Sequence, residues 1–306
     1  MVMPLSEENR GTLLSVIAYL IWGLSALYWV EAYPVAPADI LAHRALWSVV
    51  FVFTCLLLWG RLGSALAYLR NPKTVVVMAA AASCSAANWL VFLWAVTNGK
   101  ATEASLGYFL MPLFNVVIGL TLFKESLDNP QKIGVAFAVA AVLLQLWYFQ
   151  GLPLVALGLP LSFGIYGAIR KKVDVGSVEG LFIETLLMAP FAIAWLWFHD
   201  WGGLGQYGLK VDLFLLGAGA FTAIPLMAYV VASRLLPLTA LGLVFYIGPT
   251  TQLMVAVLIF KEPFNTVQLV AFTLVWVGLF FVVADSLRRS RLWQRLRGAA
   301  SEPPQV

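Results

Sequence analysis

The sequence has few charged residues: Asp, Glu, Lys and Arg together make up only 11% of its 306 positions. Soluble globular domains carry about 25%. Hydrophobic residues make up 61%, so this chain could not cover a surface that faces water. The apolar runs are long enough for membrane-spanning helices rather than for barrel strands. The composition therefore predicts an all-α integral membrane protein.

Residues that usually form disulfides or hold metals are also scarce, with two cysteines and two histidines. Cys55 and Cys84 both lie in apolar runs and are expected to be packing residues. The sequence contains no phosphate-binding glycine loop, no metal-ligand spacing and no nucleophile elbow. The net charge of +4 follows membrane topology rather than a nucleic-acid surface. We therefore expect no cofactor, no metal, no ATP use, no catalytic residues and no nucleic-acid partner.

Ten apolar stretches of about 20 residues, the length that crosses a bilayer, follow one another along the chain. The connections are short, so no separate soluble domain is expected, and no cleavable signal peptide is evident. The predicted spans are residues 11–30, 39–59, 74–97, 101–123, 131–149, 153–171, 178–198, 212–234, 238–260 and 265–284.

Basic residues are distributed unevenly over the connections between these spans. With a cytoplasmic N-terminus, about 15 of the 19 lysines and arginines fall on the cytoplasmic side. Because lysine and arginine concentrate in cytoplasmic loops, both termini are predicted to be cytoplasmic. The tail at residues 286–306 begins with a basic, amphipathic stretch, which is expected to lie on the anionic inner leaflet of the membrane.

One pattern occurs twice: a proline within an apolar run is followed at the same distance by Phe-Lys-Glu. Pro112 precedes Phe123-Lys124-Glu125, and Pro249 precedes Phe260-Lys261-Glu262. The copies fall in the fourth and ninth spans, so each half has five spans and the second half must enter the membrane inverted. We therefore predict two inverted five-helix repeats around a central cavity. They comprise residues 11–149 and 150–285.

The two prolines are predicted to interrupt their helices. A proline leaves the carbonyl four residues before it without its helical donor, here the carbonyls of Tyr108 and Phe245. An unsatisfied group in hydrocarbon costs several kcal/mol, so a neighbouring helix, a water molecule or a solute must meet it. Matched interruptions in two halves indicate a transporter binding site. The alternative is that both prolines only kink packed helices.

Three acidic or basic side chains lie more than one turn from the ends of predicted spans: His43, Arg44 and Glu184. A charge at the bilayer centre costs about 2.5–3.5 kcal/mol, so such residues usually face protein or water. In the functional interpretation, His43 and Glu184 are candidates for coupling transport to protons. Arg44 binds an anionic group of the solute or lies at the outer entrance of the cavity. The alternatives are a hydrogen-bonded packing histidine, an arginine that reaches the headgroups or closes a helix contact, and a glutamate held by backbone or by a cytoplasmic base.

Polar and aromatic residues form stripes at helical spacing in six of the spans. A single stripe is more typical of helix packing, but six together predict an aromatic, uncharged cavity. Aromatic rings would enclose the solute, and amides would hydrogen-bond to it. The substrate-binding candidates are Trp22, Arg44, Asn88, Trp89, Tyr108, Asn115, Tyr166, Tyr246 and Gln252.

Several motifs resemble the RarD group of the EamA family, in the drug/metabolite transporter superfamily. They include Ile40-Leu-Ala-His43-Arg44-Ala-Leu-Trp47-Ser48, Asn88-Trp89, Ser105-Leu-Gly-Tyr-Phe and Tyr246-Ile-Gly-Pro249-Thr. The resemblance covers nearly the whole chain. It implies ten helices in two inverted repeats, a bacterial inner membrane, and a central cavity lined mainly by the first four helices of each repeat. RarD-like proteins are associated by name with chloramphenicol. The second half departs from the first, with Ile183-Glu184 where His-Arg would align.

The leading interpretation is a secondary transporter that exports small amphipathic organic metabolites or drugs by alternating access, as a monomer or a homodimer. One alternative is a membrane-embedded enzyme that acts on a lipid-linked substrate with Glu184 or His43 as the base, although the sequence lacks a clustered acid/base set. The other is a membrane subunit or sensor that transports nothing itself.

Overall fold

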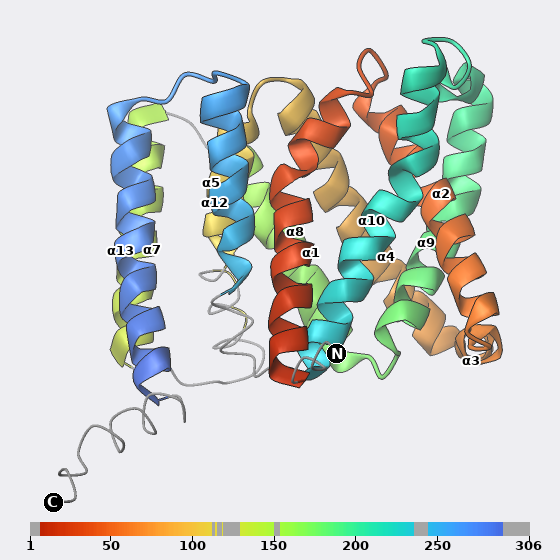
Figure 1. Ribbon diagram of the computed structural model, residues 1–306, viewed down its shortest axis with the longest axis horizontal. Coiled ribbons are helices and arrows are strands. Elements are labelled where there is room, and N and C mark those ends of the chain that lie inside the picture. Colours follow the sequence, from red (N-terminus) through yellow and green to blue (C-terminus); the bar gives the residue numbers. More distant parts are fainter. Residues whose placement is uncertain are drawn as a thin grey trace, which may run out of the picture. The chain divides into compact units, whose positions relative to one another are not determined.

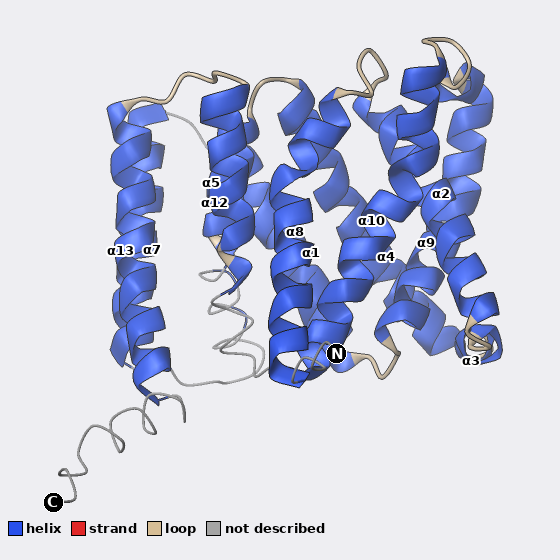
Figure 2. Cartoon of the chain, viewed as in Figure 1, coloured by secondary structure: helices blue, strands red, loops and turns tan. Residues whose placement is uncertain are grey.

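The structure is a computed structural model that describes residues 7–111, 114, 118, 129–149, 154–235 and 244–289. All regular secondary structure within these residues is helical (Figure 2). Several helices are long and apolar enough to cross a membrane, which confirms the all-α membrane class. They are α1 (Glu7–Val30), α2 (Pro37–Leu58), α4 (Pro72–Thr97), α9 (Ser177–Phe198) and α10 (Leu209–Leu235).

The other predicted spans contain the remaining long or interrupted helices. These are α5 (Ala101–Phe109), α7 (Asn129–Phe149), α8 (Leu154–Lys172), α12 (Ile247–Met254), which continues into the π-helix η2 (Val255–Ile259), and α13 (Thr266–Arg289). Two short elements between spans were not predicted. They are α3 (Leu62–Tyr68) and the 3₁₀-helix η1 (Asp200–Gly203).

Local chemistry explains where several helices begin. Pro37 and Pro72 stand at the first helical positions of α2 and α4, where a missing N–H breaks no helical bond. The Asn71 side chain accepts a bond from the Lys73 N–H at 3.0 Å and so caps α4. Asn265 and Gln268 bond reciprocally at the start of α13, each side chain accepting from the other residue's N–H at 2.9 Å.

The contacts divide the chain into two compact units, each of which takes helices from both predicted repeats. The first unit contains α1 to α5, α8, α9, α10 and α12 with η1 and η2, and the second contains α7 and α13 (Figure 1). Within the second unit, Phe137 stacks on Phe281 with ring centroids 6.1 Å apart. Gly278 of α13 faces Phe137 and Gly134 of α7, which allows these two helices to approach closely.

Helix packing within the first unit follows a symmetric pattern. Helix α1 packs on α10 and α12, and α8, which lies five spans later, packs on α4 and α5. Helix α2 packs on α9, its own counterpart in the second half, and α5 packs likewise on α12. If each helix is replaced by the helix at the same place in the other half, the contacts of α1 become those of α8.

The crossing of α10 and α2 depends on Gly219. A Cβ atom at this position would lie 2.1 Å from the Trp47 carbonyl oxygen and 2.6 Å from the Ser48 nitrogen. We expect Gly219→Ala to lower the apparent melting temperature in detergent by several degrees, because overpacking costs about 1–3 kcal/mol. Gly167→Ala in α8 is the matched control, since no neighbouring atom lies within 4 Å of the position that its methyl group would take. Equal losses for both variants would contradict the argument.

Candidate functional site

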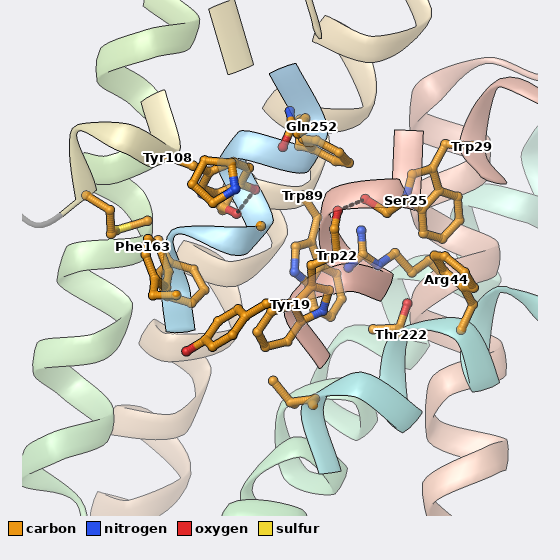
Figure 3. A pocket seen from close by; sticks show the side chains of 18 residues that line it. Tyr19, Trp22, Ser25, Trp29, Arg44, Trp89, Tyr108, Phe163, Thr222 and Gln252 are labelled. Carbon is orange, nitrogen blue, oxygen red and sulfur yellow. Dashed lines mark hydrogen bonds between the residues drawn. The ribbon is translucent and has the colours of Figure 1, made fainter. Parts of the chain in front are cut away.

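A cavity of about 120 Å³ lies within the first unit (Figure 3). Helices α1, α2, α4, α5, α8, α10 and α12 all contribute to its wall. Its volume is comparable to that of an engineered cavity of about 150 Å³ that accepts benzene. None of the described lining residues is acidic, and nine of the 18 are aromatic. The aromatic ones are Tyr19, Trp22, Trp29, Trp89, Phe92, Tyr108, Phe163, Phe221 and Phe245.

Part of the wall is a cluster of rings packed edge to face. The Tyr19 ring centroid lies 5.6 Å from that of Trp22 and 5.5 Å from that of Phe245, at steep interplanar angles. Such pairs contribute about 0.5–1.5 kcal/mol beyond the area that they bury. Tyr19 comes from α1 and Phe245 from the segment just before α12, so the cluster joins the two halves of the sequence.

Arg44 is the basic group in the described wall. Its guanidinium carbon lies 4.1 Å from the Trp89 ring centroid and 5.0 Å from the Trp29 ring centroid. The residue is 8% exposed, and its Nε atom has no hydrogen-bond partner among the described residues. Each cation–π contact is worth about 0.5–2 kcal/mol, while an isolated buried charge costs far more. Arg44 is therefore a cation held by aromatic rings, and no described residue supplies its counter-charge.

The amides near the cavity mostly connect helices. The Asn88 amide nitrogen donates to the Leu159 carbonyl at 2.9 Å and to the Ser162 hydroxyl at 3.1 Å, which ties α4 to α8. The Tyr108 hydroxyl lies 3.5 Å from the side-chain amide oxygen of Asn88. Gln252 lies 3.5 Å from the Ala101 carbonyl. By contrast, the Thr222 hydroxyl in the wall has no hydrogen-bond partner among the described residues.

Helices α5 and α12 meet beside the cavity at Pro249. A turn at Tyr246 precedes α12, so Pro249 stands in the first turn of a new helix, where its missing N–H costs little. The Ser105 hydroxyl donates to the Pro249 carbonyl at 2.7 Å. The sequence had pointed to the Phe245 carbonyl as the group needing a partner, whereas the bond from Ser105 goes to Pro249. Pro112 and Asn115 lie outside the described residues.

Glu262 was not predicted as a functional residue, although it belongs to the repeated Phe-Lys-Glu. Its carboxylate accepts bonds from the backbone N–H groups of Ala101 and Thr102, both at 2.8 Å, and from the Thr102 hydroxyl at 2.7 Å. It therefore caps the N-terminus of α5, where a negative charge is favoured. The duplicated motif was the signal that could have identified it.

His43 is fully buried, and both of its ring nitrogens are engaged. The Trp47 indole N–H donates to Nδ1 at 3.3 Å, and Nε2 lies 3.0 Å from the Trp201 carbonyl oxygen. Because an indole N–H can only donate, Nδ1 accepts and the ring proton sits on Nε2. This geometry matches a hydrogen-bonded packing histidine, and His43 is not among the described lining residues.

Glu184 lies in a separate buried cluster. One carboxylate oxygen is 3.4 Å from Arg170 Nε, and the other accepts a bond from the Tyr166 hydroxyl at 3.2 Å. The alternative to a coupling role was a glutamate held by a basic residue, and Arg170 is such a partner. Neither Glu184 nor Tyr166 is a described lining residue. A coupling role for His43 or Glu184 stays a prediction.

The structure gathers most of the described candidates in the cavity wall and leaves others outside it. Tyr246, like Tyr166, is not a lining residue; its ring lies 6.2 Å from that of Phe109. Tyr19 and Trp29 line the cavity but were missed, although both extend the Trp22 stripe at helical spacing. The candidates in the wall are Trp22, Arg44, Asn88, Trp89, Tyr108, Pro249 and Gln252.

Comparison with known proteins adds independent information. The model of the EamA-like transporter family matches residues 9–147 and again residues 152–284. An uncharacterized transporter of Pseudomonas aeruginosa is 38% identical, over 94% of this chain and 98% of the relative. A protein of Salmonella typhimurium named RarD is 37% identical, over 94% of this chain and 99% of the relative. A solved crystal structure with 19% identity shares the fold, with a TM-score of 0.64 over 91% of this chain and 99% of the other.

Proposed function

Because the chain belongs to the EamA-like transporter family, and within it to the RarD group, we propose that it is a secondary transporter that exports small amphipathic organic solutes by alternating access. The observation that carries this proposal is the composition of the cavity wall. Helices α1, α2, α4 and α5 from the first family-matched segment line the cavity together with α8, α10 and α12 from the second. Transporter binding sites commonly lie where two repeats meet.

The proposed architecture is a pair of inverted five-helix repeats. The double match to the family model and the symmetric packing of α1 with α10 and of α8 with α4 support this arrangement. The turn before Pro249 supplies an interrupted helix beside the cavity, as in other transporters built from such repeats. In alternating access, the two repeats would rock about the bound solute and expose it to one side at a time.

The proposed location is a bacterial inner membrane, with both termini in the cytoplasm. The distribution of lysine and arginine along the connections supports this orientation. The basic tail from residue 286 would rest on anionic lipid, and its residues beyond Arg289 lie outside the described part of the chain. The functional unit would be a monomer or a homodimer.

Purified protein in liposomes tests the proposal. We expect at least one of an aromatic metabolite, an amino acid or an amphenicol to cross faster than in empty liposomes. Because no ATP is supplied, such flux would be driven by the solute gradient or by an ion gradient imposed across the bilayer. If none of these solutes crosses faster than in empty liposomes under any imposed gradient, the proposal fails.

A blocked cavity should abolish this flux. Ser25 lines the cavity and is 6% exposed, and its hydroxyl donates only to Trp22 of its own helix. We expect Ser25→Trp to reduce flux to the level of empty liposomes, because the indole would occupy the space of the solute. Ser83→Trp is the matched control: Ser83 also bonds within its own helix, to Ala79, but it is exposed. Normal flux through the Ser25→Trp variant would exclude this cavity as the route.

A further inference from the structure

Arg44 is the one buried lysine or arginine in the described part of the chain. Buried carboxylates there have basic partners elsewhere: Glu179 pairs with Arg61, and Glu184 pairs with Arg170. No ion pair or hydrogen bond from a described residue reaches Arg44, which has only the faces of Trp29 and Trp89. A guanidinium enclosed in this way needs a counter-charge, and this part of the chain supplies none.

Two unpartnered polar atoms belong to the cavity wall. Arg44 Nε and Thr222 Oγ1 are buried, and neither has a hydrogen-bond partner among the described residues. Both groups carry a hydrogen that can be donated. Buried donors normally have acceptors, so two orphaned donors lining one cavity indicate an acceptor that the described residues do not provide. A carboxylate suits this role, because it accepts several bonds and its geometry matches the guanidinium fork.

The rest of the wall suits an apolar body. Nine aromatic residues line a volume of about 120 Å³, which is enough space for a single ring. The described lining residues include no carboxylate that could neutralise a cationic ligand. A cation would find aromatic faces, but it would be repelled by Arg44. Figure 3 shows Arg44 reaching from α2 toward Trp89, among the labelled aromatic side chains.

We infer that the cavity binds a small organic anion, with its carboxylate on Arg44 and its single-ring or apolar body against the aromatic wall. This inference rests on the transport function proposed above and specifies the class of solute. Thr222 donates a second hydrogen bond to the anion. Arg44 thereby acts as a charge selector: it retains monocarboxylates and disfavours cations and neutral analogues.

Three ligands of nearly the same size and shape test the charge preference: benzoate, benzamide and benzamidine, with net charges of −1, 0 and +1. Their binding to the purified wild-type protein in detergent is measured by calorimetry and by the rise in apparent melting temperature. We expect benzoate to bind about tenfold or more tightly than benzamide, and benzamidine to bind most weakly, because only the anion makes charge-assisted bonds to Arg44.

Variants locate the preference within the cavity. Arg44→Gln should make benzoate and benzamide bind equally, and Arg44→Lys should keep part of the preference because lysine retains the charge without the planar fork. Thr222→Val should weaken benzoate binding while leaving benzamidine binding unchanged. Arg70→Gln removes an exposed arginine and should leave the ratio of the two affinities as in the wild type.

Binding of the three ligands to the wild-type protein tests the anion preference even if the Arg44 variants do not fold. Binding of benzamide or benzamidine as tight as that of benzoate overturns the inference, and so does the absence of binding by all three. If uncharged solutes nevertheless cross liposomes, the transport function stands and only the anion preference falls. If benzoate binds through Arg44 but no solute crosses, the anion site stands and the transport function falls.

Discussion

Replacing Glu184 by leucine is expected to lower the apparent melting temperature by on the order of 10 °C, because Arg170 would lose its carboxylate partner. The Glu184 side chain is 2% exposed and that of Arg170 is 16% exposed. Removing one member of a buried ion pair costs about 3–5 kcal/mol. Arg170 would stay largely enclosed and keep only long bonds to the Met78 sulfur at 3.4 Å and to the Gly176 carbonyl at 3.5 Å. The measurement is thermal unfolding of the purified protein in detergent, followed by circular dichroism.

A double replacement separates the ion pair from simple packing loss. Glu184→Leu combined with Arg170→Met should recover most of the lost melting temperature, because two apolar side chains of similar volume leave no unpaired charge. Glu103→Leu is the matched control: Glu103 pairs with Lys100, but the two side chains are 26% and 43% exposed. Such a pair contributes at most about 1 kcal/mol. The explanation is wrong if the single and double variants melt alike, or if Glu103→Leu is equally damaging.

The helical class and the positions of the helices could be predicted from the sequence because the signal is local. An apolar run of about 20 residues identifies itself without knowledge of its neighbours. Helix α3 was missed for the same reason, since seven residues at Leu62–Tyr68 are too few to span a membrane. The start of α12 at Ile247, inside a predicted span of residues 238–260, reflects a backbone interruption that hydropathy does not register.

The sequence predicts which residues share one face of a helix, but it does not predict whether that face lines the cavity. Trp22, Asn88 and Trp89 belong to stripes whose spacing places them on one side of a helix, and they do line the cavity. Tyr166 belongs to a similar stripe, yet its hydroxyl meets Glu184 on the neighbouring helix. The bond between His43 and Trp201 joins residues 158 positions apart. Whether a polar residue lines a cavity or binds another helix depends on such distant partners, which one sequence does not reveal.

Replacing Glu262 by alanine is expected to increase access to the cavity about 10- to 100-fold from the end where α5 begins. The Glu262 carboxylate accepts three bonds from Ala101 and Thr102 and so joins the segment after η2 to α5. Hydrogen bonds to a charged group are worth about 1.5–3 kcal/mol, and their loss shifts an equilibrium between closed and open forms by roughly that factor. Glu262→Gln should have a smaller effect, since one acceptor oxygen remains.

A single reporter cysteine measures this access. Ser25→Cys places a thiol in the cavity wall after Cys55 and Cys84 have been changed to serine. In right-side-out vesicles, a membrane-impermeant thiol reagent should label this cysteine faster when Glu262→Ala is present, because the Glu262 end faces outward in the proposed orientation. Glu103→Gln, on the same helix but outside this contact, should leave the labelling rate unchanged. If the labelling rate is unchanged in a folded Glu262→Ala variant, the Glu262 contact only caps α5 and does not control access to the cavity.

The duplicated motif contains a second glutamate, whose replacement should change the labelling rate in the opposite direction. Glu125 holds the place of Glu262 in the first copy of the repeat and lies outside the described residues. If inverted repeats exchange roles in alternating access, a bond that closes one side in one state has a counterpart that closes the other side in the opposite state. Glu125→Ala should then slow the external labelling that Glu262→Ala accelerates. A shift in the same direction for both variants would show that the two glutamates stabilise the fold rather than its alternating states.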